Sequence, residues 1–333
     1  MQMQLDNLGW KQYKKGLAQE NSFPEENVAR VAIENRGGYS LYSPSGELEG
    51  IMRGKFMRGK KANSAYPKVG DWVIFEKLIG EKKAIIESIL PRISQLSRNK
   101  VGEVFEEQII AANIDIVFIV QGLNGDFNLS RLERYVTMAH EGNCEPIILL
   151  NKCDAINDAQ EKISTAKKSL SGIKIFLVSA RDGIGIEHVQ SLIDPGVSLV
   201  FVGSSGAGKS TIINRLLGAN RQKTGTTRTD DSKGRHTTTR RELILLENGG
   251  IIIDTPGMRE LGIWTQEKAV AAETFKDIDA LIGSCKFNDC NHNNCKGCAI
   301  TEAVSEGKIS LDRYQRFLKI SQEAGSGNKK TWA

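Results

Sequence analysis

The segment GSSGAGKS at residues 203–210 constrains the fold of this chain more than any other stretch. It matches the pattern G-x-x-x-x-G-K-[ST], and it lies between the apolar run VSLVFV and the helical pattern TIINRLL. A strand, a glycine-rich turn and a helix in this order form a loop whose backbone amides wrap a phosphate group. The sequence therefore predicts a phosphate-binding loop made of Gly203, Ser204, Ser205, Gly206, Ala207, Gly208, Lys209, Ser210 and Thr211. We expect Lys209 to reach the β- and γ-phosphates as a catalytic residue, and Ser210 to ligate Mg²⁺.

The chain around this loop alternates between apolar strands and helical patterns. Continuous apolar runs, which are typical of strands covered on both faces, occupy residues 114–120, 145–151, 173–180 and 197–203. Helical patterns separate them at residues 128–142, 158–171 and 185–193. Two further strands follow the phosphate loop, at residues 241–250 and 251–257. Alternation of this kind predicts a central α/β domain with a parallel sheet.

The tetrapeptide NKCD at residues 151–154 ends one of these strands, at the edge where ligands bind in such sheets. Asp154 is predicted to accept hydrogen bonds from guanine N1–H and the exocyclic amine, a donor pair that adenine lacks. We expect Asn151 to brace the phosphate loop and the Lys152 stem to lie along the base, with Cys153 completing the motif. NKxD alone is a weak signal, often just a polar strand end, but beside a phosphate loop it predicts guanine specificity.

Two further short motifs complete the predicted nucleotide site. The next strand ends in VSA, where Ser179 precedes Ala180, whose N–H is expected to contact guanine O6. DTPG at residues 254–257 ends a later strand, so Asp254 is predicted to hold Mg²⁺ through water and the Gly257 amide to sense the γ-phosphate. The order NKCD, VSA, GSSGAGKS, DTPG contains the parts of a GTPase in a cyclically shifted sequence, which one sheet can accommodate because domain termini usually lie close together. The shift connects the γ-phosphate sensor directly to the C-terminal segment.

The C-terminal segment CKFNDCNHNNCKGC predicts a metal site. Cys285, Cys290, His292 and Cys298 offer three thiolates and one imidazole, which suit one closed, tetrahedral, structural Zn²⁺ site. Cys295 competes as a ligand, and the alternative to a metal site is a set of free, buried cysteines. In a reducing compartment such a cluster favours a metal over disulfides.

Residues 28–91 read as five short strands separated by glycine and proline turns, which predicts a small, OB-like β-barrel. Barrels of this kind often bind oligonucleotides, although any small β domain would fit the pattern. A basic loop with one interleaved aromatic residue contains Arg53, Lys55, Phe56, Arg58, Lys60 and Lys61. These residues suit phosphate neutralisation and base stacking, and a solvated basic loop is the alternative.

These motifs in this order resemble the circularly permuted GTPase family called ribosome small subunit-dependent GTPase A (RsgA, also YjeQ). The matching features are NKCD, VSA, GSSGAGKST, GRHTTT, DTPG and the C-terminal Cys/His segment, and the resemblance covers nearly the whole chain. It implies an OB-like, RNA-binding barrel at 1–95, a permuted GTPase domain at 96–270 and a mostly helical zinc domain at 271–333. It also favours Cys298 as the fourth zinc ligand. The implied function is a GTP/GDP switch that binds the small ribosomal subunit and its rRNA late in subunit maturation, with subunit-stimulated hydrolysis causing release.

The residue after DTPG is Met258, which cannot position water as the glutamine of many GTPases does. Slow intrinsic hydrolysis and acceleration by a partner are therefore expected. Similarity to the family places a switch threonine, Thr238 or Thr239, on Mg²⁺ and the γ-phosphate. His236 is a candidate for orienting the attacking water, with an exposed polar residue as the alternative. Arg235 and Arg240 are rival charge stabilisers.

Length and charge set the remaining expectations. A chain of 333 residues with 40% hydrophobic residues suggests two or three globular domains. A net charge of +5 is weak support for a polyanionic partner. Without a secretory pattern or a membrane-length apolar run, we expect a cytoplasmic monomer that does not bind membranes. A passive, nucleotide-regulated RNA-binding module and a metabolic P-loop kinase are the competing hypotheses, and NKCD argues against the kinase.

Overall fold

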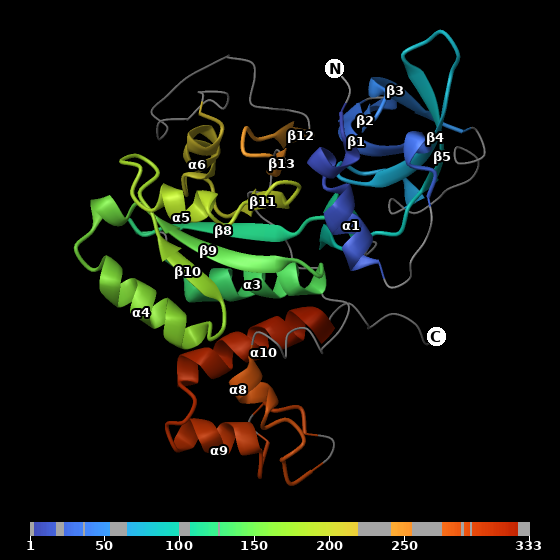
Figure 1. Cartoon of the computed structure of the whole chain (residues 1–333). Coiled ribbons are helices and arrows are strands. Elements are labelled where there is room, and N and C mark those ends of the chain that lie inside the picture. Colours follow the sequence, from blue (N-terminus) through green and yellow to red (C-terminus); the bar gives the residue numbers. More distant parts are fainter. Residues whose placement is uncertain are drawn as a thin grey trace, which may run out of the picture.

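The computed structural model has three parts, and the central one contains an α/β sheet (Figure 1). It describes residues 3–17, 23–35, 37–53, 65–99, 107–125, 127–218, 241–254, 275–287, 290–293 and 295–325. A β-barrel stands beside an α/β domain, and the C-terminal helices pack below the α/β domain near α3 in the view of Figure 1. Within the described segments, no helix has the length and apolar character needed to span a bilayer.

The N-terminal part is a closed five-stranded barrel, as the sequence predicts. Its strands are β1 (Val28–Asn35), β2 (Gly38–Ser43), β3 (Gly46–Met52), β4 (Trp72–Lys77) and β5 (Lys83–Ile89). They follow each other around the barrel in the order β1-β2-β3-β5-β4, and an antiparallel β1–β4 pairing closes the ring. Alternate side chains point inward, because successive residues of a strand face opposite sides. The inward set forms the barrel core, made of Ala29, Val31, Leu41, Leu48, Val73, Phe75, Ala84 and Ile86.

The central domain is an α/β sheet with helices on both faces. Its parallel strands run in the order β10 (Lys174–Leu177), β9 (Glu145–Asn151), β8 (Ile116–Gly122), β11 (Ser198–Val202) and β13 (Ile251–Asp254). Next to β13 in the sheet lies β12 (Glu242–Leu245), which pairs antiparallel with it, so the sheet is mixed rather than wholly parallel. One apolar cluster joins one face of the sheet to α3 (Leu129–Glu141) and α4 (Ala159–Ser169). Another joins the opposite face to α5 (Ile186–Gln190) and α6 (Lys209–Leu216).

The barrel and the central sheet are hydrogen-bonded into one sheet, which the sequence did not predict. Ile33 of β1 pairs with Glu242 of β12, so eleven strands are continuous through both parts. Two unpredicted elements reinforce this junction. A hairpin of β6 (Gln95–Asn99) and β7 (Glu107–Ala112) lies between the barrel and β8, and α1 (Trp10–Gly16) covers the barrel with Trp10 and Tyr13 buried against Trp72.

A single arginine lies at the centre of the junction. Arg30 of β1 is 1% exposed, and its guanidinium donates hydrogen bonds to four acceptors in different segments. The acceptors are the carbonyl oxygens of Leu8, Gly70 and Asn113 and the hydroxyl of Ser198, the first residue of β11. A buried arginine is tolerated because its planar fork satisfies several acceptors at once.

The C-terminal part contains α8 (Lys276–Asp279), α9 (Ala299–Ser305) and α10 (Leu311–Gly325). The chain after the cysteines forms two helices, α9 and α10, separated at the turn that contains Gly307, whose φ is 74°. Their apolar faces form a separate small core that includes Phe275, Ile300, Tyr314 and Phe317.

Buried ion pairs attach this C-terminal part to the central domain. Arg313 of α10 contacts Glu133 of α3 at 3.2 Å and the Ser169 carbonyl at 2.6 Å, and within the C-terminal part it bonds both carboxylate oxygens of Asp277 at 2.7 Å. Arg316 lies one helical turn along α10, and its Nε is 2.7 Å from Glu133 Oε2. The Glu133 side chain is fully buried, so its charge depends on these two arginines.

Candidate nucleotide site and metal centre

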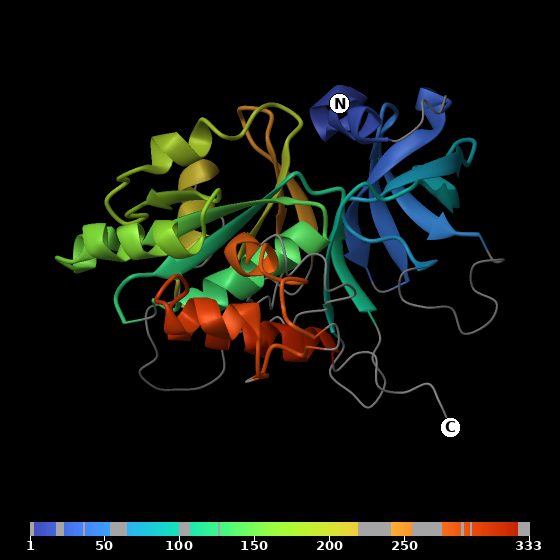
Figure 2. The same cartoon turned by 90° about the horizontal axis from the view of Figure 1, so that it is seen from below.

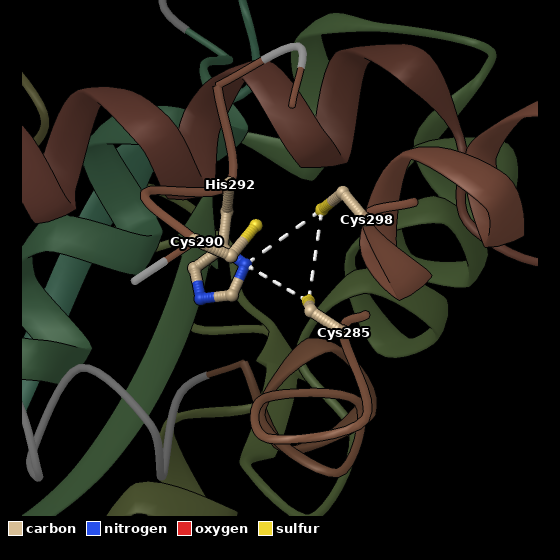
Figure 3. Close-up of side chains that lie close together, drawn as sticks. All are labelled: Cys285, Cys290, His292 and Cys298. Atoms are coloured by element: carbon tan, nitrogen blue, oxygen red, sulfur yellow. Dashed lines mark hydrogen bonds between the residues drawn. The ribbon is translucent and has the colours of Figure 1, made fainter. Parts of the chain in front are cut away.

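The four predicted zinc ligands lie together in one cluster (Figure 3). The ligand atoms of Cys285, Cys290, His292 and Cys298 all lie within 4.8 Å of one another. His292 Nδ1 is 3.5 Å from Cys285 Sγ and 3.7 Å from Cys298 Sγ, and these two sulfurs are 3.9 Å apart. With a Zn–S distance of about 2.3 Å and a Zn–N distance of about 2.0 Å, tetrahedral coordination requires about 3.8 Å between sulfurs and about 3.5 Å between sulfur and nitrogen. The donor set and its spacing therefore fit a zinc ion.

Cys295, the competing ligand, lies outside this cluster. Its thiol donates to Asn291 Oδ1 at 2.8 Å. Helix α10 supports the cluster, because the hydroxyl of Tyr314 donates to the carbonyl of His292 at 2.5 Å. His292 has a φ of 59°, an uncommon conformation for a residue with a side chain, so this bond stabilises the turn that presents the imidazole.

The predicted phosphate loop connects β11 to α6, at the carboxyl edge of the parallel strands. Gly203 has a φ of 139°, and a Cβ there would lie 2.0 Å from the carbonyl oxygen of Val120 on the neighbouring strand β8. Only glycine fits this close approach. The ammonium group of Lys209 donates to the carbonyl oxygens of Gly203 and Ser204, both at 2.7 Å. Lys209 thus lies folded over its own loop, within reach of a phosphate that the loop would enclose.

Asn151 connects the base motif to the phosphate loop. Its side chain is 2% exposed, and Nδ2 donates to the Ala207 carbonyl at 2.8 Å. Its Oδ1 accepts from the Ala180 N–H at 2.9 Å. A Cβ on Gly208 would lie 2.1 Å from Asn151 Nδ2, so the last loop glycine makes room for this asparagine. One buried amide therefore holds three strand ends, those of β9, β10 and β11, in fixed register.

The remaining residues of the NKCD motif follow the end of β9. Asp154 lies exposed in the short 3₁₀ turn Cys153–Ala155. Lys152 has a φ of 65°, and its Cδ would lie 3.6 Å from a Cβ on Gly122, so its stem runs beside the end of β8. The Cys153 N–H donates to the Val178 carbonyl at 3.3 Å, which joins this turn to the VSA strand.

Some predicted site residues are placed and others are not. Asp254 ends β13, half-buried, at the same edge as the phosphate loop. Ser210 and Thr211 lie in the first turn of α6 and are also half-buried. Other residues with predicted roles lie outside the described residues, namely Arg235, His236, Thr238, Thr239, Arg240, Gly257 and Met258.

The RsgA GTPase family profile matches residues 89–264, more than half of the chain. The chain belongs to the RsgA GTPase family. It is 38% identical to the small ribosomal subunit biogenesis GTPase RsgA of Opitutus terrae, over 96% of this chain and 90% of that protein.

Solved structures give the RsgA-family fold. YjeQ from Thermotoga maritima is 26% identical with a TM-score of 0.67, covering 90% of this chain and 98% of that one. YloQ, described as a circularly permuted GTPase, is 21% identical with a TM-score of 0.65, covering 93% and 100%. At that identity the second match shows the fold alone. Together with the strand order, these matches confirm the permuted GTPase fold predicted from the motif order.

As an RsgA-family GTPase, the chain is a hydrolase that acts on GTP. The cyclically shifted motif order still brings the motifs to one edge, because each motif follows the carboxyl end of a parallel strand of one sheet. Sequence reasoning missed one residue that touches this site. Arg215 of α6 contacts the VSA loop, but a basic residue near a helix C-terminus reads as an ordinary partner of the helix dipole, so no signal distinguished it.

Proposed function

We propose that this chain is a GTP-dependent assembly factor of the small ribosomal subunit. In the proposed cycle the GTP form binds the subunit and its rRNA, the subunit stimulates hydrolysis, and the GDP form dissociates. The observation that carries the proposal is the Asn151 bridge, which joins the guanine motif to the phosphate loop at one sheet edge. The names of the relatives, small ribosomal subunit biogenesis GTPases, support the choice of partner. Such a role belongs in the cytoplasm and needs only a monomer.

The proposed roles of the nucleotide-site residues follow from their positions. Asp154 selects guanine, and the phosphate-loop amides with Lys209 hold the β- and γ-phosphates. Ser210 and Asp254 would hold Mg²⁺, Ser210 directly and Asp254 through water, and the ion would offset the charge of the phosphates. The Ala180 N–H, which donates to Asn151 in this structure, would share its hydrogen between Asn151 and guanine O6.

Catalysis is assigned to residues of the two switch segments. We propose Thr238 as a Mg²⁺ ligand, the Gly257 amide as the γ-phosphate sensor and His236 as the group that orients water. Because Met258 cannot position water, the isolated chain is expected to hydrolyse GTP slowly. The subunit would accelerate the reaction by fixing these residues around the phosphate.

The three proposed domains, at 1–95, 96–270 and 271–333, have distinct tasks in this cycle. The barrel would bind rRNA through its basic loop, of which Arg53 is described and forms a surface ion pair with Glu87. The C-terminal domain would bind one structural Zn²⁺ through Cys285, Cys290, His292 and Cys298. Because β12 pairs with the barrel strand β1 and immediately follows the segment that contains Thr238, movement near the nucleotide has a short path to the barrel.

The test is a GTP turnover assay with purified small subunits. We expect slow turnover by the chain alone and at least tenfold stimulation by small subunits, with no stimulation by purified large subunits. Lys209→Ala should abolish turnover in both conditions, which verifies that the measured activity belongs to this site. Subunit binding of equal strength with GTP and GDP, without stimulation, would instead identify a passive RNA-binding module.

A further inference from the structure

Arg215 reaches from the phosphate-loop helix to the loop that follows β10. Its Nε donates to the Ala180 carbonyl at 3.0 Å, and its NH2 group donates to the Arg181 carbonyl. Its NH1 group lies beside Gly183, 3.4 Å from the position that a Cβ would occupy there. One guanidinium therefore contacts three of the four residues that follow Ser179, although 34 residues separate Arg215 from Arg181 in the chain.

These contacts hold Ala180 from both sides. Its N–H donates to Asn151 and its C=O accepts from Arg215, so both peptide planes that flank Ala180 are fixed. Asn151 is itself bonded to Ala207 of the phosphate loop, and that loop leads directly into α6, which carries Arg215. The contacts form a closed ring that runs from the phosphate loop through Asn151, Ala180 and Arg215 back to α6.

We propose that Arg215 is a positioning residue for guanine recognition, because it orients Ala180 so that its N–H meets the O6 atom of the base. The inference rests on the proposed assignment of the base site. Lys209 and Arg215 lie six residues apart on one helix, about 9 Å along its axis. The helix thus carries a phosphate ligand at its start and the support of the base loop near its end, so both ends of the nucleotide meet groups fixed to one rigid element.

The chemistry of the side chain fits this role. The guanidinium presents several N–H donors in a planar fork, which bonds two successive carbonyls at once. Lysine at this position would reach one carbonyl at a time, and methionine would reach none while filling similar space. Arg215 is exposed on its outer side, so the free energy of its two hydrogen bonds is moderated by water. We therefore expect a moderate effect on affinity.

The experiment compares two ligands that differ only in the atom at the 6-position of the base. One is GDP, and the other is 6-thioguanosine diphosphate, which keeps N1–H, the 2-amine, ribose and phosphates but carries sulfur, a much weaker hydrogen-bond acceptor, in place of O6. Isothermal titration should show that Arg215→Met weakens GDP binding about three- to tenfold and changes binding of the analogue less than twofold. Arg215→Lys should fall between wild type and Arg215→Met. Lys174→Met, which removes an exposed pair with Glu145 at the opposite edge of the sheet, is the matched control and should change neither affinity.

Each outcome decides between distinct causes. Equal losses for both ligands would mean that Arg215 only stabilises the domain, and an unchanged GDP affinity in both variants would remove it from recognition; either result overturns the inference. If the wild-type chain fails to prefer GDP over the analogue, the assignment of Ala180 to O6 fails instead. Arg215→Lys retains the charge and one hydrogen bond, so it provides the comparison should Arg215→Met not fold.

Discussion

At the scale of single residues, Asp154 is expected to decide which purine binds. Its carboxylate accepts from two donors of guanine, whereas the amide of asparagine presents an N–H that suits the C2 carbonyl of xanthine. Asp154→Asn should therefore weaken GDP binding at least about 100-fold and strengthen binding of xanthosine diphosphate. Competition titrations with the two nucleotides measure the exchange. Asp158→Asn, which removes an exposed partner of Lys162 four residues away, is the control, and undiminished GDP affinity in Asp154→Asn would disprove the assignment.

A second residue, Glu141, makes stability depend on pH. It is the last residue of α3, and within the described part of the chain neither carboxylate oxygen has a hydrogen-bond partner, although both are buried. Burial raises the pKa of Glu141 from 4.5 to about 8. Between these pH values the folded chain holds a proton that the unfolded chain has released, so stability falls as pH rises through this window. The helix C-terminus disfavours the negative charge further.

Glu141→Gln should remove this loss. We expect the free energy of unfolding of the variant to exceed that of the wild type by about 1–2 kcal/mol at pH 9, after allowance for partial solvation, and by little at pH 6. Urea unfolding at the two pH values measures the difference. Glu145→Gln, at an exposed position, should leave the pH profile unchanged. A parallel shift of Glu141→Gln at both pH values would contradict the explanation.

At the scale of elements, the junction between barrel and GTPase sheet depends on Arg30. Removing its guanidinium takes a donor from four buried acceptors in four segments, of which only the Gly70 carbonyl keeps a second donor among the described residues, the Asn113 side-chain amide. Arg30→Met should therefore destabilise the chain by roughly 3 kcal/mol or more, and Arg30→Lys should not restore it because an ammonium lacks the planar fork. Thermal unfolding followed by circular dichroism provides the measurement. Arg53→Met, the same change at a half-exposed arginine, should shift the midpoint little, and equal shifts in the two variants would refute a special role for Arg30.

At the scale of the whole molecule, the C-terminal domain has its own small core and its own Cys/His cluster, and the Glu133 ion pairs with Arg313 and Arg316 attach it to the GTPase domain. Figure 2, viewed from below, shows α10 along the α3 side of the GTPase domain. Since the metal would stabilise only the loop and helices that it contacts, we expect chelation to unfold this domain while GDP binding persists. Hydrogen exchange should rise in α9 and α10 and stay low in β8 and β9.

The ligand set is tested in the same experiment. Cys298→Ser should lower the zinc content well below one ion per chain, whereas Cys295→Ser should retain it, because Cys295 bonds to Asn291 outside the cluster. Elemental analysis of the two purified variants measures this difference. Retained protection of α9 after metal removal would show that the apolar core suffices and that zinc is dispensable for the fold.

Features that depend on short, continuous stretches of the chain could be predicted from the sequence alone. The phosphate loop, the NKCD strand end and the five barrel strands were all predicted, because turn chemistry and side-chain periodicity are local properties of the chain. The cysteine cluster was readable for a similar reason, since its ligands fall within 14 residues, from 285 to 298. These patterns identified the motif order and with it the permuted fold.

Only the tertiary structure decided how these parts are joined. Arg30 reads as the polar position of a strand, yet it is buried because the outer face of β1 meets the GTPase sheet. Likewise, Glu133 and Arg313 are 180 residues apart, and Arg215 meets Ala180 from a helix that follows another strand. Charged side chains carry no periodic signal that tells a solvated position from a buried one. Their partners are fixed only when segments distant in sequence pack together, so the junctions and the ring around Ala180 were determined by the fold as a whole.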